Sequence, residues 1–271
     1  MKVASLWAVL LLFSSPAWGA RPDIQSGSPS VLSVAADEWF PVNGQPASDH
    51  PGFAIEILEA IFEPLGIDVD YRLSGWSRSL EMARNGQVDC VIGAYHGDAP
   101  ALLFPRTPVA LDDLAFYVDA ASQWQYQGPA SLDQVSIGAI ADYSYGELLD
   151  GYLREHASED RIQMIHGLKP LERNIGKLLS GRIDVLVESQ LVMESMIERQ
   201  RLGGKVREAG RIGLSEPVFL ACSPDKSTTP EYLRLFDEGM ARLRESGELA
   251  RIMTRYGLPV PPLPAQELSA P

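Results

Sequence analysis

The fold of this chain is decided by two stretches that share one pattern, Asn85-Gly86-Gln87-Val88-Asp89-Cys90-Val91-Ile92 and Ser180-Gly181-Arg182-Ile183-Asp184-Val185-Leu186-Val187. In each stretch a glycine follows a predicted helix, where it can adopt the left-handed conformation that commonly ends helices. The apolar residues that come next are typical of a buried strand. The preceding helices also align, Leu80 and Ala83 with Ile175 and Leu178. Because one unit of helix, turn and strand occurs twice, the sequence predicts two similar α/β lobes.

Short apolar runs alternate with helical patterns on both sides of these stretches. Strands are predicted at 31–36, 67–73, 88–93, 114–118, 135–141, 162–165, 183–187 and 218–222. Helices are predicted from Phe53 to a stop at Gly66, and at 77–85, 146–155, 170–179, 230–245 and 248–256. This alternation is typical of βαβ units, so we expect each lobe to hold a mixed, mostly parallel sheet with flanking helices.

The first nineteen residues have the organisation of a cleavable signal peptide. Lys2 precedes an apolar run from Val3 to Phe13, and Ala17-Trp18-Gly19 places small side chains at the −3 and −1 positions of a cleavage site. The run is much shorter than the ~20 residues that cross a bilayer. We therefore expect residues 1–19 to be removed after Gly19, which sends the mature protein out of the cytoplasm. A Pro-rich tail is predicted at 259–271.

The composition is that of an acidic globular protein, with 45% hydrophobic and 22% charged residues and a formal net charge of −13. This charge argues against nucleic acid or an anionic membrane surface as a partner. Cys90 and Cys222 each lie in an apolar run, and they could form one disulfide or remain buried thiols. The four histidines show no metal-ligand spacing, and no phosphate-binding or dinucleotide motif occurs. The sequence therefore predicts neither a metal nor a cofactor.

A serine nucleophile is the first enzyme chemistry to consider. Asp142-Tyr143-Ser144-Tyr145-Gly146 lies between a predicted strand and a predicted helix, but Asp142 stands where a nucleophile elbow has its first glycine. A serine at a helix start more often caps the helix, and the backbone N–H groups there suit an anion or a ligand carbonyl. We therefore predict a binding role for this segment and no catalytic residue.

The residues just after the predicted strands combine aromatic and polar side chains. In an open α/β sheet, ligands bind at the carboxyl ends of the strands. The segments at these positions are 37–40, 74–76, 94–96, 142–145 and 188–189. Any single tryptophan or tyrosine among them could simply pack in a core, but their recurrence at equivalent strand ends favours a ligand-binding cleft.

The order and spacing of these segments resemble those of the bacterial extracellular solute-binding proteins, family 3, which are periplasmic proteins of the polar amino-acid-binding type. The resemblance spans roughly 31–258, and its carriers are Val31–Asp37 with Pro41, Gly52–Ile57, Trp76 to Asp89, Gly138–Gly146 and Gly181–Asp184. It implies the two-lobed periplasmic binding protein type II fold, which closes on its ligand by a hinge motion. Lobe one would comprise 30–119 and 218–258, and lobe two 120–217, with crossings near Tyr117–Ala121 and Glu216–Cys222.

The same resemblance assigns roles within the cleft. Trp39 and Trp76 match aromatic walls, Ala94–His96 match a segment that contacts the ligand, and Tyr143–Tyr145 match the helix start that holds the ligand carboxylate. The full predicted set is Glu38, Trp39, Phe40, Trp76, Ala94, Tyr95, His96, Asp98, Tyr143, Ser144, Tyr145, Glu188 and Ser189.

Two positions of the sequence depart from the family pattern. Gly97-Asp98-Ala99-Pro100 contains no arginine where the family has a clamp for the α-carboxylate, and Ser189 stands where the family has the aspartate that binds the ammonium group. Glu188 is one residue away, which in a strand is the opposite face. The loss of a bidentate arginine removes a strong contact. A cationic or neutral ligand is therefore an alternative to an α-amino acid.

Three functions follow from these observations. The first is a monomeric periplasmic protein that captures a small polar solute for an ABC-type importer or a membrane sensor. The second is an enzyme on the same scaffold, similar to cyclohexadienyl dehydratases, with His96, Asp98 or Glu188 as the base. The third is a partner-binding protein whose cleft is filled by Trp39, Trp76, Tyr95 and Tyr145. We expect the first, a non-enzyme.

Overall fold

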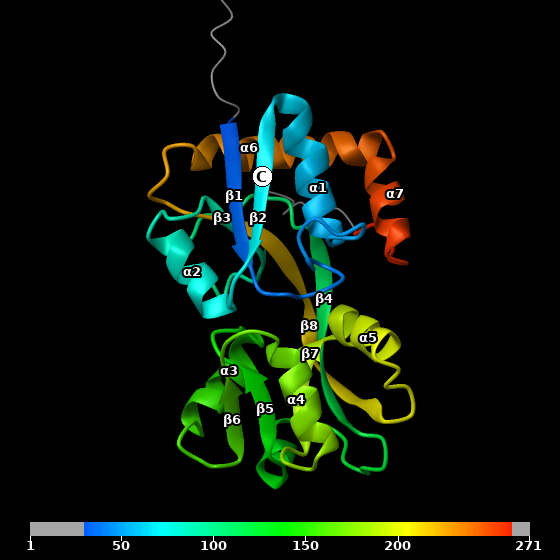
Figure 1. The fold of residues 1–271 in the computed structure, drawn as a ribbon. Coiled ribbons are helices and arrows are strands. Elements are labelled where there is room, and N and C mark those ends of the chain that lie inside the picture. The colour runs from blue at the N-terminus through cyan, green and yellow to red at the C-terminus, as the bar shows by residue number, and fades with distance from the viewer. Residues whose placement is uncertain (1–29, 262–271) are drawn as a thin grey trace, which may run out of the picture.

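The computed structural model of the protein describes residues 30–261, so the predicted signal peptide and most of the predicted tail lie outside the described residues. The described chain forms two halves that are stacked end to end and joined by two long strands, β4 (Ala110–Asp119) and β8 (Val206–Cys222) (Figure 1). These strands run antiparallel to each other through both halves. The predicted two-lobed α/β fold is thereby confirmed.

One continuous sheet contains all the strands of the described chain, in the order β2-β1-β3-β8-β4-β7-β5-β6. In the first half, β1 (Ser30–Ala36) pairs in parallel with both β2 (Ile67–Leu73) and β3 (Cys90–Ala94). In the second half, β5 (Ile137–Ile140) pairs in parallel with β6 (Ile162–Ile165) and β7 (Val185–Ser189). The antiparallel pairs of the sheet involve β4 or β8, so each half has the predicted mixed, mostly parallel sheet.

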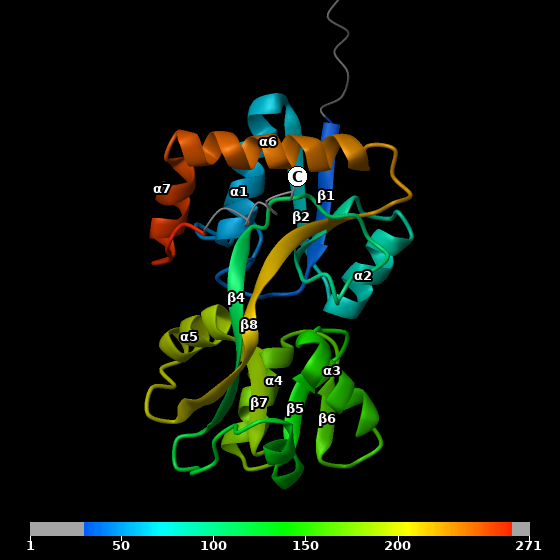
Figure 2. The same cartoon turned by 180° about the vertical axis from the view of Figure 1, so that it is seen from behind.

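The helices flank the sheet in both halves (Figures 1 and 2). The first half carries α1 (Phe53–Phe62), η1 (Glu63–Leu65), α2 (Trp76–Arg84), α6 (Thr229–Glu245) and α7 (Glu248–Arg255). The second half carries η2 (Pro129–Gln134), α3 (Gly146–Glu155), α4 (Pro170–Leu179) and α5 (Gln190–Arg199). None of the helices within residues 30–261 is long and apolar enough to cross a membrane.

The repeated pattern has a structural cause in both halves. Gly86 and Gly181 have φ values of 63° and 68°, in the left-handed region that glycine tolerates. Asp89 Oδ2 accepts hydrogen bonds from the backbone N–H and the hydroxyl of Ser33, at 2.9 and 2.5 Å. Asp184 Oδ2 accepts the same two bonds from Ser136, at 2.8 and 2.6 Å. In each half the aspartate therefore ties the turn after the helix to a neighbouring parallel strand.

Some boundaries differ from the sequence expectation. Helix α5 and the first part of β8 were not predicted. Strands β3 and β7 begin two residues later than expected. The reason is that Val88 and Ile183 are buried but precede the paired part of the strand. Residues 114–118 of β4 pair with β7. The crossings near Tyr117–Ala121 and Glu216–Cys222 and the division of the chain into lobes at 119/120 and 217/218 stay predictions.

The structure decides between the two alternatives for the cysteines. Cys90 on β3 and Cys222 on β8 lie directly opposite each other and form a disulfide, and no free cysteine is present in the described chain. The bond joins the sheet of the first half to the strand that returns from the second.

Candidate functional site

The carboxyl ends of the parallel strands of the two halves face each other across a narrow cleft. A small cavity there is lined by Asp37, Trp39, Asn43, Trp76, Ile92, Gly93, Tyr95, Asp98 and Tyr143. Its volume is about 10 Å³, which is roughly the space that one water molecule needs. The structure therefore shows the two halves closed on each other.

Three aromatic side chains donate hydrogen bonds from one half to the other. The Tyr143 hydroxyl donates to Asp37 Oδ2 at 2.6 Å, and the Trp39 indole donates to Glu188 Oε1 at 3.0 Å. On the rim, the Trp76 indole donates to the backbone carbonyl of Asp142 at 3.0 Å. The aromatic residues predicted to wall the cleft thus also hold its two sides together.

The start of helix α3 is occupied by carboxylates of the protein itself. Asp98, from the first half, accepts hydrogen bonds from the backbone N–H groups of Tyr95, at 2.8 Å, and of Ser144, across the cleft. Asp150 accepts from the Ser144 hydroxyl and from the Tyr145 N–H, both at 2.8 Å. The position where the resemblance places a ligand carboxylate therefore already has carboxyl groups of the protein as partners.

Strand β4 contributes a further acid, Asp112, which the sequence did not single out. Its Oδ2 accepts a hydrogen bond from the Tyr95 hydroxyl at 2.6 Å, and its Oδ1 accepts one from the Ser189 hydroxyl at 2.8 Å. Ser189 also accepts from the Val192 N–H and so caps helix α5. Asp112 lies where β4 passes between the halves, and only the sheet pairing brings it to Ser189.

Burial dominates the electrostatics of this site. It raises the pKa of Glu188 to about 8, against the hydrogen bonds from Trp39 and Ser189, which lower it. Burial also raises the pKa of Asp37 and of Asp112 to about 6 each. The pKa of Asp98 is raised well above its usual value for the same reason. Within residues 30–261, no lysine, arginine or histidine forms an ion pair with any of these four carboxyl groups.

Several predicted residues lie away from the small cavity. Glu38 is near Arg199 at 3.7 Å, and the Arg199 guanidinium lies 4.6 Å from the centre of the Phe40 ring, so this group bridges the halves at the outer edge. His96 stacks on Phe219 with ring centres 4.5 Å apart. It lines a separate pocket of about 170 Å³ with Gly97 and others.

Two other predicted residues are buried. Tyr145 lies in the core of the second half, where its hydroxyl accepts from the Ile140 N–H at 2.7 Å, and Ala94 is buried at the end of β3.

Sequence reasoning missed three residues that the structure places at the cavity or next to it. Asp37 was noted as a strand-end residue but not chosen, and Asn43 and Asp112 were not noted. A signal for Asp37 existed, because it directly follows β1 at the carboxyl edge. For Asp112 the sequence holds no comparable signal, since its partners are distant in the chain, and Asn43 lies in a loop that no strand end marks. Ligand binding by the predicted residues stays a prediction.

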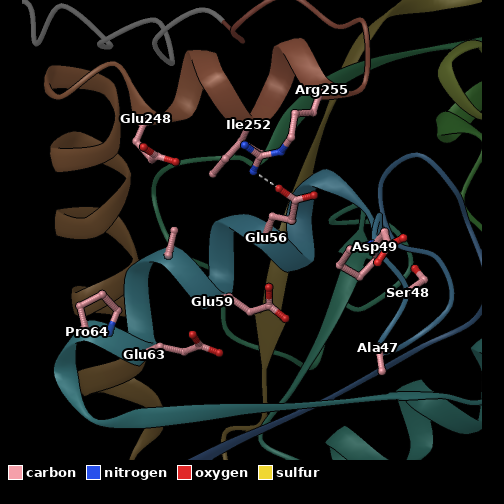
Figure 3. A pocket seen from close by; sticks show the side chains of 12 residues that line it. Ala47, Ser48, Asp49, Glu56, Glu59, Glu63, Pro64, Glu248, Ile252 and Arg255 are labelled. Atoms are coloured by element: carbon pink, nitrogen blue, oxygen red, sulfur yellow. Dashed lines mark hydrogen bonds and ion pairs between the residues drawn. The ribbon is translucent and has the colours of Figure 1, made fainter.

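A larger hollow of about 730 Å³ lies on the outer surface of the first half, between α1, α7 and the loop at 47–51 (Figure 3). Its carboxylates are those of Asp49, Glu56, Glu59, Glu63 and Glu248, and Arg255 pairs with Glu56. This hollow is remote from the carboxyl ends of the strands and lies within one half. We therefore take the cleft as the candidate ligand site. Within the described part of the chain, no group of three or more potential ligands is arranged to hold a metal ion.

Comparison with known proteins gives both a family and a set of similar folds. The model of the bacterial extracellular solute-binding proteins, family 3, matches residues 32–259. No curated protein matches the sequence.

The similar solved structures include the sensor domain of a histidine kinase with similarity to periplasmic binding proteins, at a TM-score of 0.69 and 21% identity over 84% of this chain and 95% of that one. The arginine-, lysine-, histidine-binding protein ArtJ from Geobacillus stearothermophilus has a TM-score of 0.69 and 15% identity, and the match covers 87% of this chain and 97% of ArtJ. The amino acid ABC transporter substrate-binding protein AbpA from Streptococcus pneumoniae, bound to L-arginine, has a TM-score of 0.66 and 19% identity, over 84% and 94%. At these identities the likeness establishes a shared fold.

Proposed function

This chain belongs to the bacterial extracellular solute-binding proteins, family 3, and we propose that it captures a small polar solute in the cleft between its two halves. The solute would be an amino acid or a related compound, and the protein would act in the periplasm after removal of residues 1–19. It would deliver the solute to the permease of an ABC importer or to a membrane sensor. The similar protein AbpA is described as the substrate-binding protein of an amino acid ABC transporter. We propose that it works as a monomer and catalyses no reaction.

One observation carries the proposal: polar groups from both halves meet in the cleft and are buried there. Glu188 is 1% exposed and lies 3.0 Å from the Trp39 indole of the other half. A buried carboxyl group without a basic partner reduces stability. Titratable groups with such perturbed pKa values gather at functional sites, which supports a role in binding.

Two of the three bases considered above, Asp98 and His96, are poorly placed for catalysis. Both oxygens of Asp98 accept backbone hydrogen bonds, and His96 is stacked on Phe219 outside the small cavity. A general base must reach the proton that it removes. We therefore propose binding without turnover.

The nearly filled cavity favours a second candidate, a protein that binds a partner and takes up no solute. Its space of about 10 Å³ admits no amino acid while the halves remain closed. In proteins of two hinged lobes, however, opening of the hinge exposes such a site. The two candidates differ in whether the halves open and close around a solute.

Native mass spectrometry and calorimetry test the proposal. We expect the protein purified from its own cell envelope to begin at Ala20 and to carry a small molecule. After mild unfolding and refolding removes that molecule, calorimetry against amino acids, polyamines and other polar metabolites should give binding to one class. Absence of any binding, together with an unchanged radius of gyration in every solute, would favour the partner-binding candidate.

A further inference from the structure

The hydrogen-bond donors of the cleft are already used by acceptors within the protein. The Tyr143 hydroxyl donates to Asp37, the Trp39 indole to Glu188 and the Tyr95 hydroxyl to Asp112. Each of these acceptors is a carboxyl oxygen. A ligand carboxylate, which only accepts hydrogen bonds, would have to displace one of these buried interactions.

The backbone donors at the start of α3 are used in the same way. The Ser144 N–H donates to Asp98 and the Tyr145 N–H donates to Asp150. A ligand carboxylate bound here would have to displace the carboxyl groups of Asp98 and Asp150 from these N–H donors. The segment Gly97–Pro100 holds no arginine, and Arg84 donates to the backbone carbonyl of Asp98, at 3.4 Å, and not to its carboxyl group.

Among the residues that line the cavity, the unused hydrogen-bonding capacity belongs to an acceptor. Asn43 Oδ1 is buried and has no hydrogen-bond partner, and Asn43 is only 1% exposed. Asn43 lines the cavity directly. Its amide nitrogen donates to the Asp37 carbonyl, at 2.5 Å, and to the Tyr71 hydroxyl. These two bonds identify the other amide atom, Oδ1, as the unpaired acceptor. An occupant of the cavity must therefore supply donors.

The charges and the aromatic faces point to the same class of ligand. Asp37 and Asp98 line the cavity, and Glu188 accepts the hydrogen bond of the Trp39 indole. No basic side chain of residues 30–261 forms an ion pair with these carboxyl groups, although Arg84 donates to the Asp98 backbone carbonyl at 3.4 Å. Tryptophan and tyrosine rings also make up much of the wall, and the faces of such rings attract cations. An ammonium group has three donors and no acceptor, and it is about as large as the water molecule for which the cavity has room.

From these observations we infer that the cleft takes an organic cation that carries ammonium donors and no carboxylate, that is, an aliphatic amine or diamine. This inference rests on the proposed function, because it names the class of solute for the same cleft. The ammonium group donates to Asn43 Oδ1 and to the carboxylate of Asp37, and the aliphatic part packs against the aromatic rings once the halves have opened and closed around it.

The test uses pairs of compounds that differ only in the α-carboxylate: cadaverine with lysine, agmatine with arginine and putrescine with ornithine. Calorimetry on the wild-type protein should show at least one amine that binds about 10-fold or more tightly than its amino acid, a difference of about 1.4 kcal/mol. Tighter binding of an amino acid, or binding of neutral solutes only, would overturn the inference while the proposed function stands. If no solute of any class binds, both fail.

Two substitutions test where the amine binds. Asp37→Asn removes a negative charge, and Glu188→Gln removes a carboxyl group that can ionise when a cation binds, each with little change of shape. Each should weaken amine binding by about 10-fold or more. Glu63→Gln makes the same change of charge in the acidic hollow of Figure 3. It is the matched control and should change binding by less than about 2-fold, because exposed charges are screened by salt.

If Glu63→Gln weakens amine binding as much as the other two substitutions, the outer hollow or the overall negative charge holds the amine, and the inference is wrong. Thermal unfolding of each variant shows whether it is folded. If Asp37→Asn and Glu188→Gln both fail to fold, the paired compounds on the wild-type protein still decide the question.

Discussion

The two halves contain the same turn after a helix, Gly86–Asp89 in the first and Gly181–Asp184 in the second, but its aspartate is buried in one half and exposed in the other. Asp89 in the first half is 7% exposed and lies 3.8 Å from the Lys226 ammonium, whereas Asp184 in the second half is exposed. Both aspartates make the same two bonds to a serine. The local unit is thus repeated, but its surroundings are not. The first half also has α6, α7 and the disulfide, so it should be the more stable of the two.

Removal of the disulfide tests that difference most strongly. The bond between Cys90 and Cys222 spans a sequence separation of 132 residues and joins β3 to β8 in the first half. Replacement of both cysteines by serine should lower the free energy of unfolding by about 2–5 kcal/mol, since the unfolded chain is no longer restrained. Urea unfolding followed by circular dichroism measures this loss.

Reduction of the wild-type protein is the control for the double substitution, and it should give a similar shift of the urea midpoint. A midpoint that neither treatment moves would mean that the disulfide adds nothing to the first half, and that the halves do not differ in this respect.

The two aspartates offer the most direct comparison between the halves. In Asp89→Ala, the Ser33 N–H and hydroxyl lose a charged acceptor in a buried place, which should cost about 1.5–3 kcal/mol of stability. In Asp184→Ala, water can reach the Ser136 groups, so the loss should be below about 1 kcal/mol. Both are measured by urea unfolding. Equal losses would show that exposure does not distinguish the two turns.

The contact between the halves can be changed without a change inside either of them. A Cβ atom on Gly97 would lie 2.3 Å from Ser144 Oγ and 2.9 Å from Ser144 Cβ across the cleft, so rotation of the hydroxyl alone does not relieve the clash and Ser144 must shift. Gly97→Ala should therefore disfavour closure by about 1–3 kcal/mol, as overpacking does. Small-angle scattering should show a larger radius of gyration, and binding of any cleft ligand should weaken.

Gly75→Ala is the matched control for that substitution, because Gly75 also faces the other half. Its added Cβ would meet Gly167 at 3.7 Å, an ordinary contact. The radius of gyration of Gly75→Ala should equal that of the wild-type protein. If Gly97→Ala scatters in the same way as its control, the closed arrangement is not what the unliganded protein adopts in solution.

The comparison of the halves also explains how much of the structure the sequence could predict. Elements with a local signal were predicted closely: α3, β6 and α4 have the expected bounds, and the repeated glycine and aspartate do end a helix and begin a strand. Helix α5 was missed, although Ser189 at its start is a residue type that caps helices. Its apolar positions are too mixed to give a clear helical period.

The cleft was predicted less completely, for a physical reason. Strand ends mark the site in the sequence, and this signal led to Trp39, Tyr143 and Glu188. The acceptor role of Asp112 depends on Tyr95 and on Ser189, which is 77 residues away. The occupation of the α3 start by Asp98 likewise depends on closure of the two halves. Such contacts arise from tertiary structure, so no local pattern encodes them.

The smallest expected effect is a dependence of stability on pH that belongs to the cleft alone. Burial raises the pKa of Glu188 from 4.5 to about 8, so near neutral pH the folded protein holds a proton that the unfolded chain has released. Stability must then fall as the pH rises from about 4.5 towards 8, because the unfolded state binds fewer protons. The charged and titratable groups that face Glu188 are all acidic or phenolic, namely Asp37, Asp112, Tyr95, Tyr117, Tyr143 and Tyr145.

Between pH 6.5 and 7.5 the Asp37 and Asp112 carboxyls, with pKa values of about 6, are largely ionised. Asp98, whose pKa burial also raises, is present in every variant, so the difference in slope between the wild-type protein and Glu188→Gln reports Glu188. The wild-type protein should lose about 1 kcal/mol over this interval, close to the limit of about 1.4 kcal/mol per pH unit for one group. The Glu188→Gln variant should lose much less stability over the same interval, and Glu63→Gln should lose as much as the wild-type protein. The urea midpoints of the three proteins at pH 6.5 and 7.5 measure these losses. Parallel slopes in all three proteins would mean that Glu188 is ionised in the folded state, and that the cleft already holds a compensating cation.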